Sequence, residues 1–291
     1  MADKIAFLIN PKSGTANSRK QAGELVAFVK DHPNYELYEL QTADEMAETT
    51  NHLAQKNYSA VFGCGGDGTL NLVSKHLLGT DTALGMIGLG SGNGFTRHQG
   101  IPLKWNKAIL VANKPKIKTV DTGLINGIHF LNIAGVGFAA KISHAFKNET
   151  KRGLSGYFRA VLQNIKMDPF HLNIKNEAGE WEGDAWMVDF CNGSQWGNNF
   201  RIEPGARDDD GAFNAVVFKK MSAFKIPALG FRFATNTVSQ SEDVYSFAGS
   251  DFTMEFEGEL PLHVDGEAIA IVKDKIEVKV IPQSLKIWIL D

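Results

Sequence analysis

Residues 61–71 read VFGCGGDGTLN, which places one carboxylate, that of Asp67, among four glycines directly after a short apolar run. Glycines let a backbone approach a phosphate group closely, and a helix starting at Thr69 would add free N–H donors. Phosphates normally repel a carboxylate, unless it holds Mg²⁺ or takes a proton from an attacking hydroxyl group. The stretch therefore predicts a phosphate-binding loop in which Asp67 is a metal ligand or a base.

Two further loops supply glycines and hydroxyl groups, INPKSGTAN at 9–17 and GLGSGNGF at 88–95. Neither has the GxxxxGK[ST] spacing of a Walker loop, and Asn93 occupies the last glycine position of a GxGxxG motif. One glycine loop alone is usually an ordinary turn. Three such loops at corresponding strand ends instead favour a shared ligand site.

The first 120 or so residues must supply the strands and helices that position these loops. Short apolar or alternating runs predict strands at 4–10, 35–40, 59–63 and 83–89. Helical patterns lie at 18–30, 69–78 and 105–113, and Thr42 with Glu45 forms a capping-box pattern that opens a helix through Gln55. This alternation predicts an α/β domain with a parallel sheet covered by helices.

After about Asp121 the pattern changes to one dominated by strands. A strand-like run at 128–138 is followed by two helical stretches, near 139–148 and 154–166. Short strands separated by Gly, Asn, Asp and Pro then predict a β-rich, sandwich-like domain or open barrel. Those strands are expected at 170–176, 182–192, 211–220, 251–258, 260–266, 267–273, 275–281 and 285–290. We place the domains at 1–123 and 124–291, with the alternative that the last strand returns to the first domain.

Composition narrows the functional class. The 291 residues carry a formal net charge of −3 without a long basic block, which disfavours nucleic acid as a partner. The two cysteines, Cys64 and Cys191, form no zinc-binding spacing or disulfide framework. No window approaches the roughly 20 apolar residues of a transmembrane segment. We therefore expect a cytoplasmic protein, with peripheral contact at the inner face of the membrane as an alternative.

The ordered motifs INPKSG, GGDGTLN, GSGNGFTRHQGIP, RGLSGY, PGARDDDGAF and VDGE span almost the whole chain. In this order they resemble the diacylglycerol kinase catalytic-domain family, which includes bacterial lipid kinases and sphingosine kinases. GGDGT alone is less specific, because NAD kinases and phosphofructokinases use related loops. The resemblance implies a two-domain lipid kinase that binds ATP between its domains and phosphorylates a lipid alcohol at a membrane surface. A homodimer is an open alternative.

The resemblance also assigns roles to individual residues. Glu267 matches the general base, with Asp67 as the alternative, and Asp67 and Asp121 match acidic positions near a catalytic Mg²⁺. A structural Mg²⁺ site is implied at Asp210, with the backbone carbonyl groups of Arg207 and Ala212. The implied ATP contacts are Asn10, Pro11, Lys12, Ser13, Gly14, Thr42, Gly65, Gly66, Asp67, Gly68, Thr69, Leu70, Asn71, Leu72, Ser91, Gly92 and Asn93. Because Glu267 lies about 200 residues after the glycine loop, a cleft between the domains should bring its carboxylate to face Asp67.

One position departs from the family pattern. Many diacylglycerol kinases have Asp where this chain has Gly94. Sphingosine kinases, like this chain, have no Asp at that position. The identity of the lipid substrate therefore stays open between diacylglycerol and a sphingoid type. Two alternative functions also stay open: a soluble-substrate kinase similar to NAD kinases, and a catalytically silent nucleotide- or lipid-binding regulator.

Several other residues have a structural interpretation beside a functional one. His98 and His263 lack metal-ligand spacing and are expected to be structural or on the surface. Trp196 and Phe200 could line a lipid groove, but core packing is the commoner role of aromatic residues. Lys147, Lys151 and Arg152 form a modest basic cluster that fits a solvated face better than a lipid contact.

Overall fold

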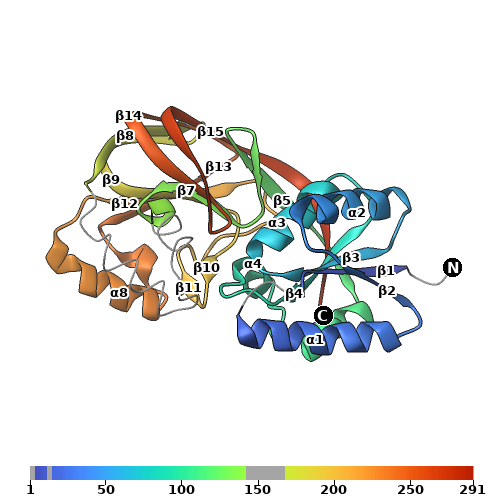
Figure 1. Ribbon diagram of the computed structural model, residues 1–291. Helices are drawn as coiled ribbons and strands as arrows, with labels where there is room; N and C mark the ends of the chain where they lie inside the picture. The colour runs from blue at the N-terminus through green and yellow to red at the C-terminus, as the bar shows by residue number, and fades with distance from the viewer. Residues whose placement is uncertain (1–3, 12–14, 142–167, 291) are drawn as a thin grey trace. The chain divides into compact units, whose positions relative to one another are not determined.

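The computed structural model describes residues 4–11, 15–141 and 168–290 (Figure 1). The chain divides into two compact units: unit 1 is Met1–Val120 with Gln283–Asp291, and unit 2 is Asp121–Pro282. The predicted boundary lies at 123/124, a few residues from this division. The C-terminal segment of the chain belongs to unit 1.

Unit 1 contains a sheet whose strands β2, β1, β3 and β4 pair in parallel in that order. Helix α1 lies on one face of this sheet, and α2 and α3 lie on the other (Figure 1). The end of β15 adds a further parallel strand through the pair Ile287 and Leu84. The elements are β1 (Ile5–Ile9), α1 (Ala16–Asp31), β2 (Tyr35–Glu39), α2 (Ala43–Gln55), β3 (Ala60–Gly65), α3 (Asp67–Leu77), β4 (Ala83–Gly88), α4 (Gly94–His98), α5 (Trp105–Ala108) and η1 (Ile109–Ala112).

Unit 2 is built mainly from antiparallel strands. Strands β14, β8, β9 and β7 pair in a closed circuit, because the long strands β9 and β14 each pair with both β7 and β8. The elements are β6 (Ile128–Phe130), β7 (Ile133–Gly137), β8 (Phe170–Asn176), β9 (Gly179–Cys191), β10 (Gln195–Gly197), β11 (Phe200–Arg201), β12 (Phe213–Lys219), η2 (Ala223–Lys225), α8 (Ile226–Ala234), η3 (Val238–Gln240), β13 (Val244–Gly249) and β14 (Asp251–Val264). Two strands cross the unit boundary, β5 (Lys116–Ile125) and β15 (Glu267–Ile289).

The mixed α/β class with a β-rich C-terminal part is confirmed. Among the described residues, most strand pairs are antiparallel, and parallel pairing occurs among β1 to β4 and at the end of β15. The predicted helices near 139–148 and 154–166 fall mostly outside the described residues. Among the described residues, the elements that were not predicted include β5, α8, β13 and the small β10–β11 hairpin.

The described residues of unit 2 form two apolar cores. The larger includes Phe130, Phe190, Phe213 and Phe252. The smaller includes Met187, Cys191, Val216 and Phe218, with Trp196 and Phe233 packed at its margin. Phe233 brings α8 into this smaller core, since its ring stacks on those of Phe218 and Trp196 with centroids 6.0 and 5.5 Å apart.

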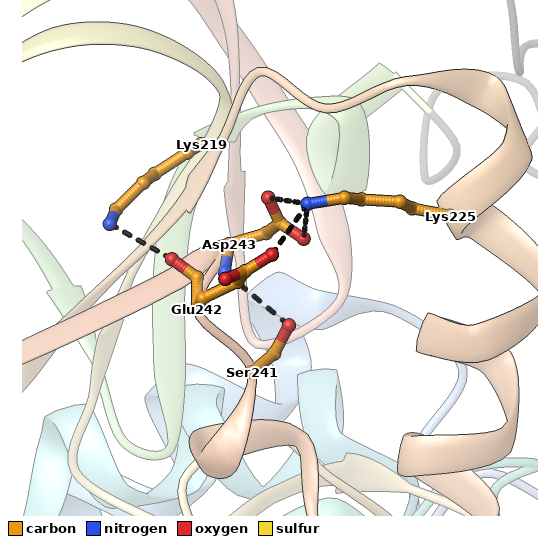
Figure 2. Close-up of polar contacts among 5 residues, drawn as sticks. All are labelled: Lys219, Lys225, Ser241, Glu242 and Asp243. Atoms are coloured by element: carbon orange, nitrogen blue, oxygen red, sulfur yellow. Dashed lines mark hydrogen bonds and ion pairs between the residues drawn. The ribbon is translucent and has the colours of Figure 1, made fainter.

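Helix α8 is attached to the segment before β13 by charged groups (Figure 2). The Lys225 ammonium group, at the N-cap of α8, lies 2.9 Å from carboxylate oxygens of Glu242 and Asp243. Lys219, at the end of β12, donates to the backbone carbonyl of Glu242 at 2.9 Å. Hydrogen bonds to Asp243 and then Glu242 raise the pKa of Lys225 above its ordinary value. These contacts fix the start of the helix that carries Phe233.

In the part of the chain that the structure describes, no helix combines the length and the apolar character needed to cross a membrane.

Candidate active site

The three predicted loops of unit 1 follow strands whose carboxyl ends are neighbours in the sheet. Ile9 pairs with Glu39 on one side and Cys64 on the other, and Gly65 pairs with Gly88. Segments 10–11, 40–42, 66–67 and 89–93 therefore leave the same edge. Such an edge is where parallel α/β sheets bind their ligands.

The glycine loops after β3 and β4 touch each other through bare backbone. A Cβ atom added to Gly90 would lie 2.5 Å from the Cα atom of Gly66, and one added to Gly66 would lie 3.2 Å from that of Gly90. The Leu89 N–H donates to the Gly65 carbonyl at 2.8 Å. Side chains at these two positions would push the loops apart, so the glycines are needed for the loops to meet.

Asp67 is the first residue of α3, and it also connects the two loops. The N-cap of α3 is Gly66, which has no side chain with which to cap the helix. The Asp67 Oδ1 atom accepts a hydrogen bond from the Phe95 N–H at 3.2 Å, at the start of α4. Asp67 thus has a structural role in addition to the role in phosphate chemistry that the sequence predicts.

Asn93 gives the loop after β4 its shape. Its backbone adopts a left-handed conformation with φ of 54°, and its buried side chain both accepts from the Gly90 N–H and donates to the Gly90 carbonyl at 2.8 Å. Arg97 Nε donates to the Gly92 carbonyl at 3.1 Å. Because the Asn93 side chain is bonded to Gly90, its backbone groups are the ones left to contact a nucleotide.

Ser91, the remaining predicted contact in this loop, borders a cavity of about 570 Å³ within unit 1. The cavity lies between the first half of α1, the loop after β4 and the start of α5. Its lining residues include the basic residues Lys20, Arg97 and Lys104, with Glu24 as the acidic one.

Asn10 and Thr42 lie at the ends of the neighbouring strands β1 and β2. Asn10 Nδ2 donates to the Gln41 carbonyl at 3.1 Å. Thr42 caps α2 through the predicted capping box with Glu45. Hydrogen bonds from the N–H groups of Gln41 and Thr42 lower the pKa of the Glu45 carboxyl group. The predicted contacts Lys12, Ser13 and Gly14 lie outside the described residues, as does the basic cluster of Lys147, Lys151 and Arg152.

Cys64, in β3 just before the glycine loop, is buried. Burial raises the pKa of its thiol group, which keeps the sulfur protonated and fits a packing role.

In unit 2 the structure brings Asp121 together with the acidic loop at 207–212. The carboxylate of Asp121 is fully buried, and its Oδ2 atom accepts from the Gly211 N–H at 2.7 Å. The Asp121 N–H donates to the Asp208 carbonyl at 2.7 Å. Asp210 Oδ1 accepts from the Ala212 N–H at 3.2 Å, and the Arg207 side chain pairs with Asp209 at 3.3 Å.

Two residues to which the sequence analysis gave no role in the site, Asn192 and Asp265, connect Asp121 to Glu267. The Asn192 amide group donates to the carbonyls of Asp121 and Leu131 at 2.8 and 2.7 Å. The buried Asp265 carboxylate accepts the N–H groups of Leu131, Asn132 and Ile133 at 2.8–3.0 Å. Asp265 and Gly266 form the left-handed turn, with φ of 49° and 81°, that leads into Glu267.

Glu267 follows this fixed turn as the first residue of β15, and its side chain is exposed. An exposed carboxylate on a rigid hairpin can reach a bound hydroxyl group. From sequence, Asp265 indicated only a turn, because the three N–H groups that surround it come from residues more than 130 positions away. The predicted approach of Glu267 to Asp67 joins residues of different units and stays a prediction.

The oxygen atoms around Asp121 and Asp210 are of the type that Mg²⁺ prefers, carboxylates and backbone carbonyls. Within the described ranges, no three or more His, Cys, Asp or Glu side chains gather as a metal cluster. The implied structural site, one carboxylate with the carbonyls of Arg207 and Ala212, uses oxygen ligands of the kind that a hard cation takes, and it stays a prediction.

Comparison with known proteins finds two family models that match successive parts of the chain. Residues 4–125 match the diacylglycerol kinase catalytic domain, and residues 133–289 match the YegS C-terminal NAD kinase beta sandwich-like domain. The chain belongs to this family of lipid kinases. A "Probable lipid kinase YegS-like" of Citrobacter koseri is 29% identical over 241 residues, covering 80% of this chain and 78% of the relative. The "Probable lipid kinase YegS" of Salmonella typhimurium is 29% identical over 233 residues, which cover 76% of this chain and 75% of the relative.

Solved structures show the same fold. A crystal structure of a diacylglycerol kinase from Bacillus anthracis has a TM-score of 0.74 at 20% identity, covering 99% of this chain and 97% of that one. Another structure from this organism has a TM-score of 0.82 at 21% identity, and the match covers 99% of this chain and 95% of that one.

Proposed function

We propose that this lipid kinase family member transfers the γ-phosphoryl group of ATP to the hydroxyl group of a lipid alcohol, a diacylglycerol or a sphingoid type. The observation that carries the proposal is the meeting of the Gly66 and Gly90 backbones beside Asp67, at the start of α3. Bare backbone at a helix N-terminus is suited to phosphate groups, because N–H donors and the positive end of the helix dipole converge there.

The triphosphate would lie along the edge formed by the ends of β1, β2, β3 and β4. Its contacts would come from Asn10 to Gly14, Thr42, Gly65 to Leu72, and Ser91 to Asn93, through backbone N–H groups and the hydroxyls of Ser13, Thr69 and Ser91. These groups position the phosphates, which is most of what phosphoryl transfer requires of a protein.

The protein would hold Mg²⁺ with oxygen ligands at two places. Asp67 and Asp121 would supply carboxylates near the phosphates, while Asp210 and the carbonyls of Arg207 and Ala212 would hold a structural ion. Bound Mg²⁺ neutralises charge on the phosphate oxygens. The hydrogen bonds of Asp121 to Gly211 and Asp208 support this proposal, because they fix the acidic loop beside it.

Glu267 would accept the proton of the lipid hydroxyl group, with Asp67 as the alternative base. A base must be both within reach and correctly oriented, and the Asp265 turn supplies the rigidity that orientation requires. The proposal further requires that ATP and the lipid meet between the two units.

The lipid would be reached at a membrane surface, which makes peripheral binding at the inner face of the membrane part of the proposal, together with a cytoplasmic location. The side chains of Phe224 and Phe231, on η2 and α8, are 95% and 68% exposed. Exposed aromatic side chains on a helix suit the boundary between headgroups and acyl chains. A homodimer stays part of the proposal.

A transfer assay with labelled ATP and Mg²⁺ tests the function directly. The acceptors are diacylglycerol, monoacylglycerol, sphingosine, ceramide and phosphatidylglycerol in mixed micelles, with NAD as a soluble acceptor. Labelled phospholipid from one lipid alcohol is the expected result. Labelling of NAD alone would favour a soluble-substrate kinase, and ATP binding without transfer to any acceptor would favour a silent regulator.

A further inference from the structure

A histidine and an aspartate pair inside unit 2, close in sequence and space to the Glu267 hairpin. His263 Nε2 lies 2.8 Å from Asp189 Oδ1, and the two side chains are 2% and 0% exposed. An ionised carboxylate only accepts hydrogen bonds, so the imidazole Nε2–H donates. The sequence predicts a structural or surface role for His263, and the structure places it in the interior.

A glycine makes this pair possible. In the sheet, His263 of β14 pairs with Gly135 of β7, and Gly135 pairs with Asp189 of β9. Directly paired residues point to the same face of a sheet, so the two side chains must meet across the middle strand. A Cβ atom added to Gly135 would lie 2.0 Å from Asp189 Oδ1. Only glycine leaves room for the carboxylate to reach the imidazole group.

The second oxygen of Asp189 has a different partner. Trp196 Nε1, on β10, donates to Asp189 Oδ2 at 3.0 Å. The indole ring of Trp196 stacks on Phe233 of α8, and Phe233 also contacts Phe200 with ring centroids 6.4 Å apart. Trp196 and Phe233 are half-buried and Phe200 is 39% exposed, so this aromatic group stands partly open to solvent.

A carboxylate suits the position of Asp189 because both neighbours are donors. An amide group there would turn its own N–H₂ toward one of them and lose that hydrogen bond. A buried hydrogen-bonded pair can often be replaced by well-packed apolar residues with little loss of stability, so a gain in stability alone does not explain this network. Its effect is to connect the strand that leads into the Glu267 hairpin with an open aromatic group.

We propose that Asp189 and His263 are positioning residues that couple the aromatic group of Trp196, Phe200 and Phe233 to the hairpin carrying Glu267. The aromatic group takes the hydrocarbon part of the lipid substrate, and through Asp189 it adds a second support that holds the hairpin in its reactive orientation. This inference rests on the proposed function, and in particular on Glu267 as the base. The hairpin is then held at two points, at Asp265 by backbone N–H groups and at His263 by Asp189.

The experiment compares His263→Leu, which removes the donor, with His263→Gln, whose amide can still donate to Asp189. Trp196→Phe removes the indole N–H together with part of the ring system, and it keeps an aromatic side chain that can pack on Phe233. The control is His171→Leu, which breaks the exposed pair of His171 with Asp184 on β8 and β9. For each protein, kcat and the KM for ATP and for a short-chain diacylglycerol in mixed micelles are measured, with amide hydrogen exchange of residues 263–268.

We expect His263→Leu to lower kcat about tenfold or more, with the KM for ATP unchanged and His263→Gln within about threefold of wild type. Trp196→Phe should raise the KM for the lipid and speed amide exchange in the hairpin. When it is combined with His263→Leu, kcat should fall by less than about a further twofold, because the effects of coupled residues are not additive. His171→Leu should change none of these quantities.

Equal losses in His263→Gln and His263→Leu would overturn the proposal, as would a fully active His263→Leu. If His263→Leu does not fold, Trp196→Phe decides: unchanged exchange in the hairpin contradicts the coupling. A wild-type protein that phosphorylates no lipid would refute the proposed function instead, while the exchange measurement would still test the connection from Trp196 to the hairpin.

Discussion

At the scale of single residues, the carboxylates of the site combine structural and chemical roles. Asp67 holds the start of α4 through the Phe95 N–H, and Asp265 holds residues 131–133 in the same way. Sequence indicated Asp67 because a carboxylate among glycines is unusual. It could not indicate Asp265, since an Asp-Gly pair is ordinary in a hairpin turn.

Asp67→Asn should separate the two roles of Asp67. The asparagine oxygen can still accept from the Phe95 N–H, so we expect the fold to persist. Loss of the charge should lower kcat by at least about 10²-fold, or ~2.7 kcal/mol of transition-state stabilisation. Asp67→Ala is the comparison, since it also removes the acceptor and should lower the melting temperature. A folded Asp67→Asn protein with normal kcat would remove this carboxylate from the mechanism.

Asp265→Ala should destabilise unit 2 and reduce activity together. It leaves the N–H groups of residues 131–133 without their acceptor, at about 1–3 kcal/mol for each buried group that water cannot reach. We expect a loss of at least about 3 kcal/mol in the free energy of unfolding, measured by urea denaturation. Asp251→Ala, at the exposed start of β14, the strand that leads to the Asp265 turn, is the control. Equal effects of the two substitutions would argue against a special role for Asp265.

At the scale of elements, sequence predicted best where local signals decide the outcome. The capping box of Thr42 and Glu45 opens α2, which ends at Gln55 as expected. Helix α8 was missed because its apolar residues face both ways: Phe233 packs into the smaller core and Phe231 is exposed. The segment has only nine residues and contains Pro227 and Gly230, which from sequence alone suggest a loop.

Strand β15 shows a second limit. Three strands were expected where one strand of 23 residues runs from Glu267 to Ile289. Asp274 and Gln283 have positive φ values, yet the strand continues past both. Turn-forming residues such as these predict that the strand ends. In the structure, pairing with β14 and then with β4 keeps the chain extended past them.

The exposed aromatic side chains of η2 and α8 give a prediction about membranes. We expect Phe224→Ser with Phe231→Ser to weaken binding to vesicles containing phosphatidylglycerol by at least about tenfold, because burial of one Phe side chain contributes roughly 1.5–3 kcal/mol. Sedimentation with vesicles measures the effect. Phe28→Ser changes an exposed aromatic residue of unit 1 and is the control. Unchanged binding of the double variant would exclude this surface from membrane contact.

At the scale of the whole molecule, the candidate residues divide between the units: the loops around Asp67 belong to unit 1, and Asp121, the 207–212 loop and Glu267 to unit 2. From sequence, the order of the motifs resembled that of a known family, and this resemblance predicted that these residues form one site. The connections inside unit 2, from Asp121 through Asn192 to Asp265, depend on strand register across long sequence separations and could not be predicted.

Mg²⁺ should stabilise the protein through the 207–212 loop. An occupied site adds RT ln(1 + [Mg²⁺]/Kd) to the free energy of unfolding, about 2.7 kcal/mol at 100 times Kd. We expect a dose-dependent rise in melting temperature that Asp210→Ala loses. Asp209→Ala is the matched control, because Asp209 belongs to the same acidic run but pairs with the Arg207 side chain. The same Mg²⁺ dependence in both variants would make this run a solvated turn.

Glu267→Gln tests whether the two units work as one enzyme. The substitution keeps the size of the side chain and leaves the Asp265 turn intact, but it removes the group that would accept the proton of the lipid hydroxyl. We expect kcat to fall by about 10²-fold or more while ATP affinity stays within about twofold, because the lost interaction belongs to the hydroxyl group and the transition state. Glu259→Gln, in the exposed part of the same hairpin, should leave kcat unchanged. Reduced ATP affinity with normal kcat would instead make Glu267 a nucleotide ligand, and the base would then have to be Asp67 in unit 1.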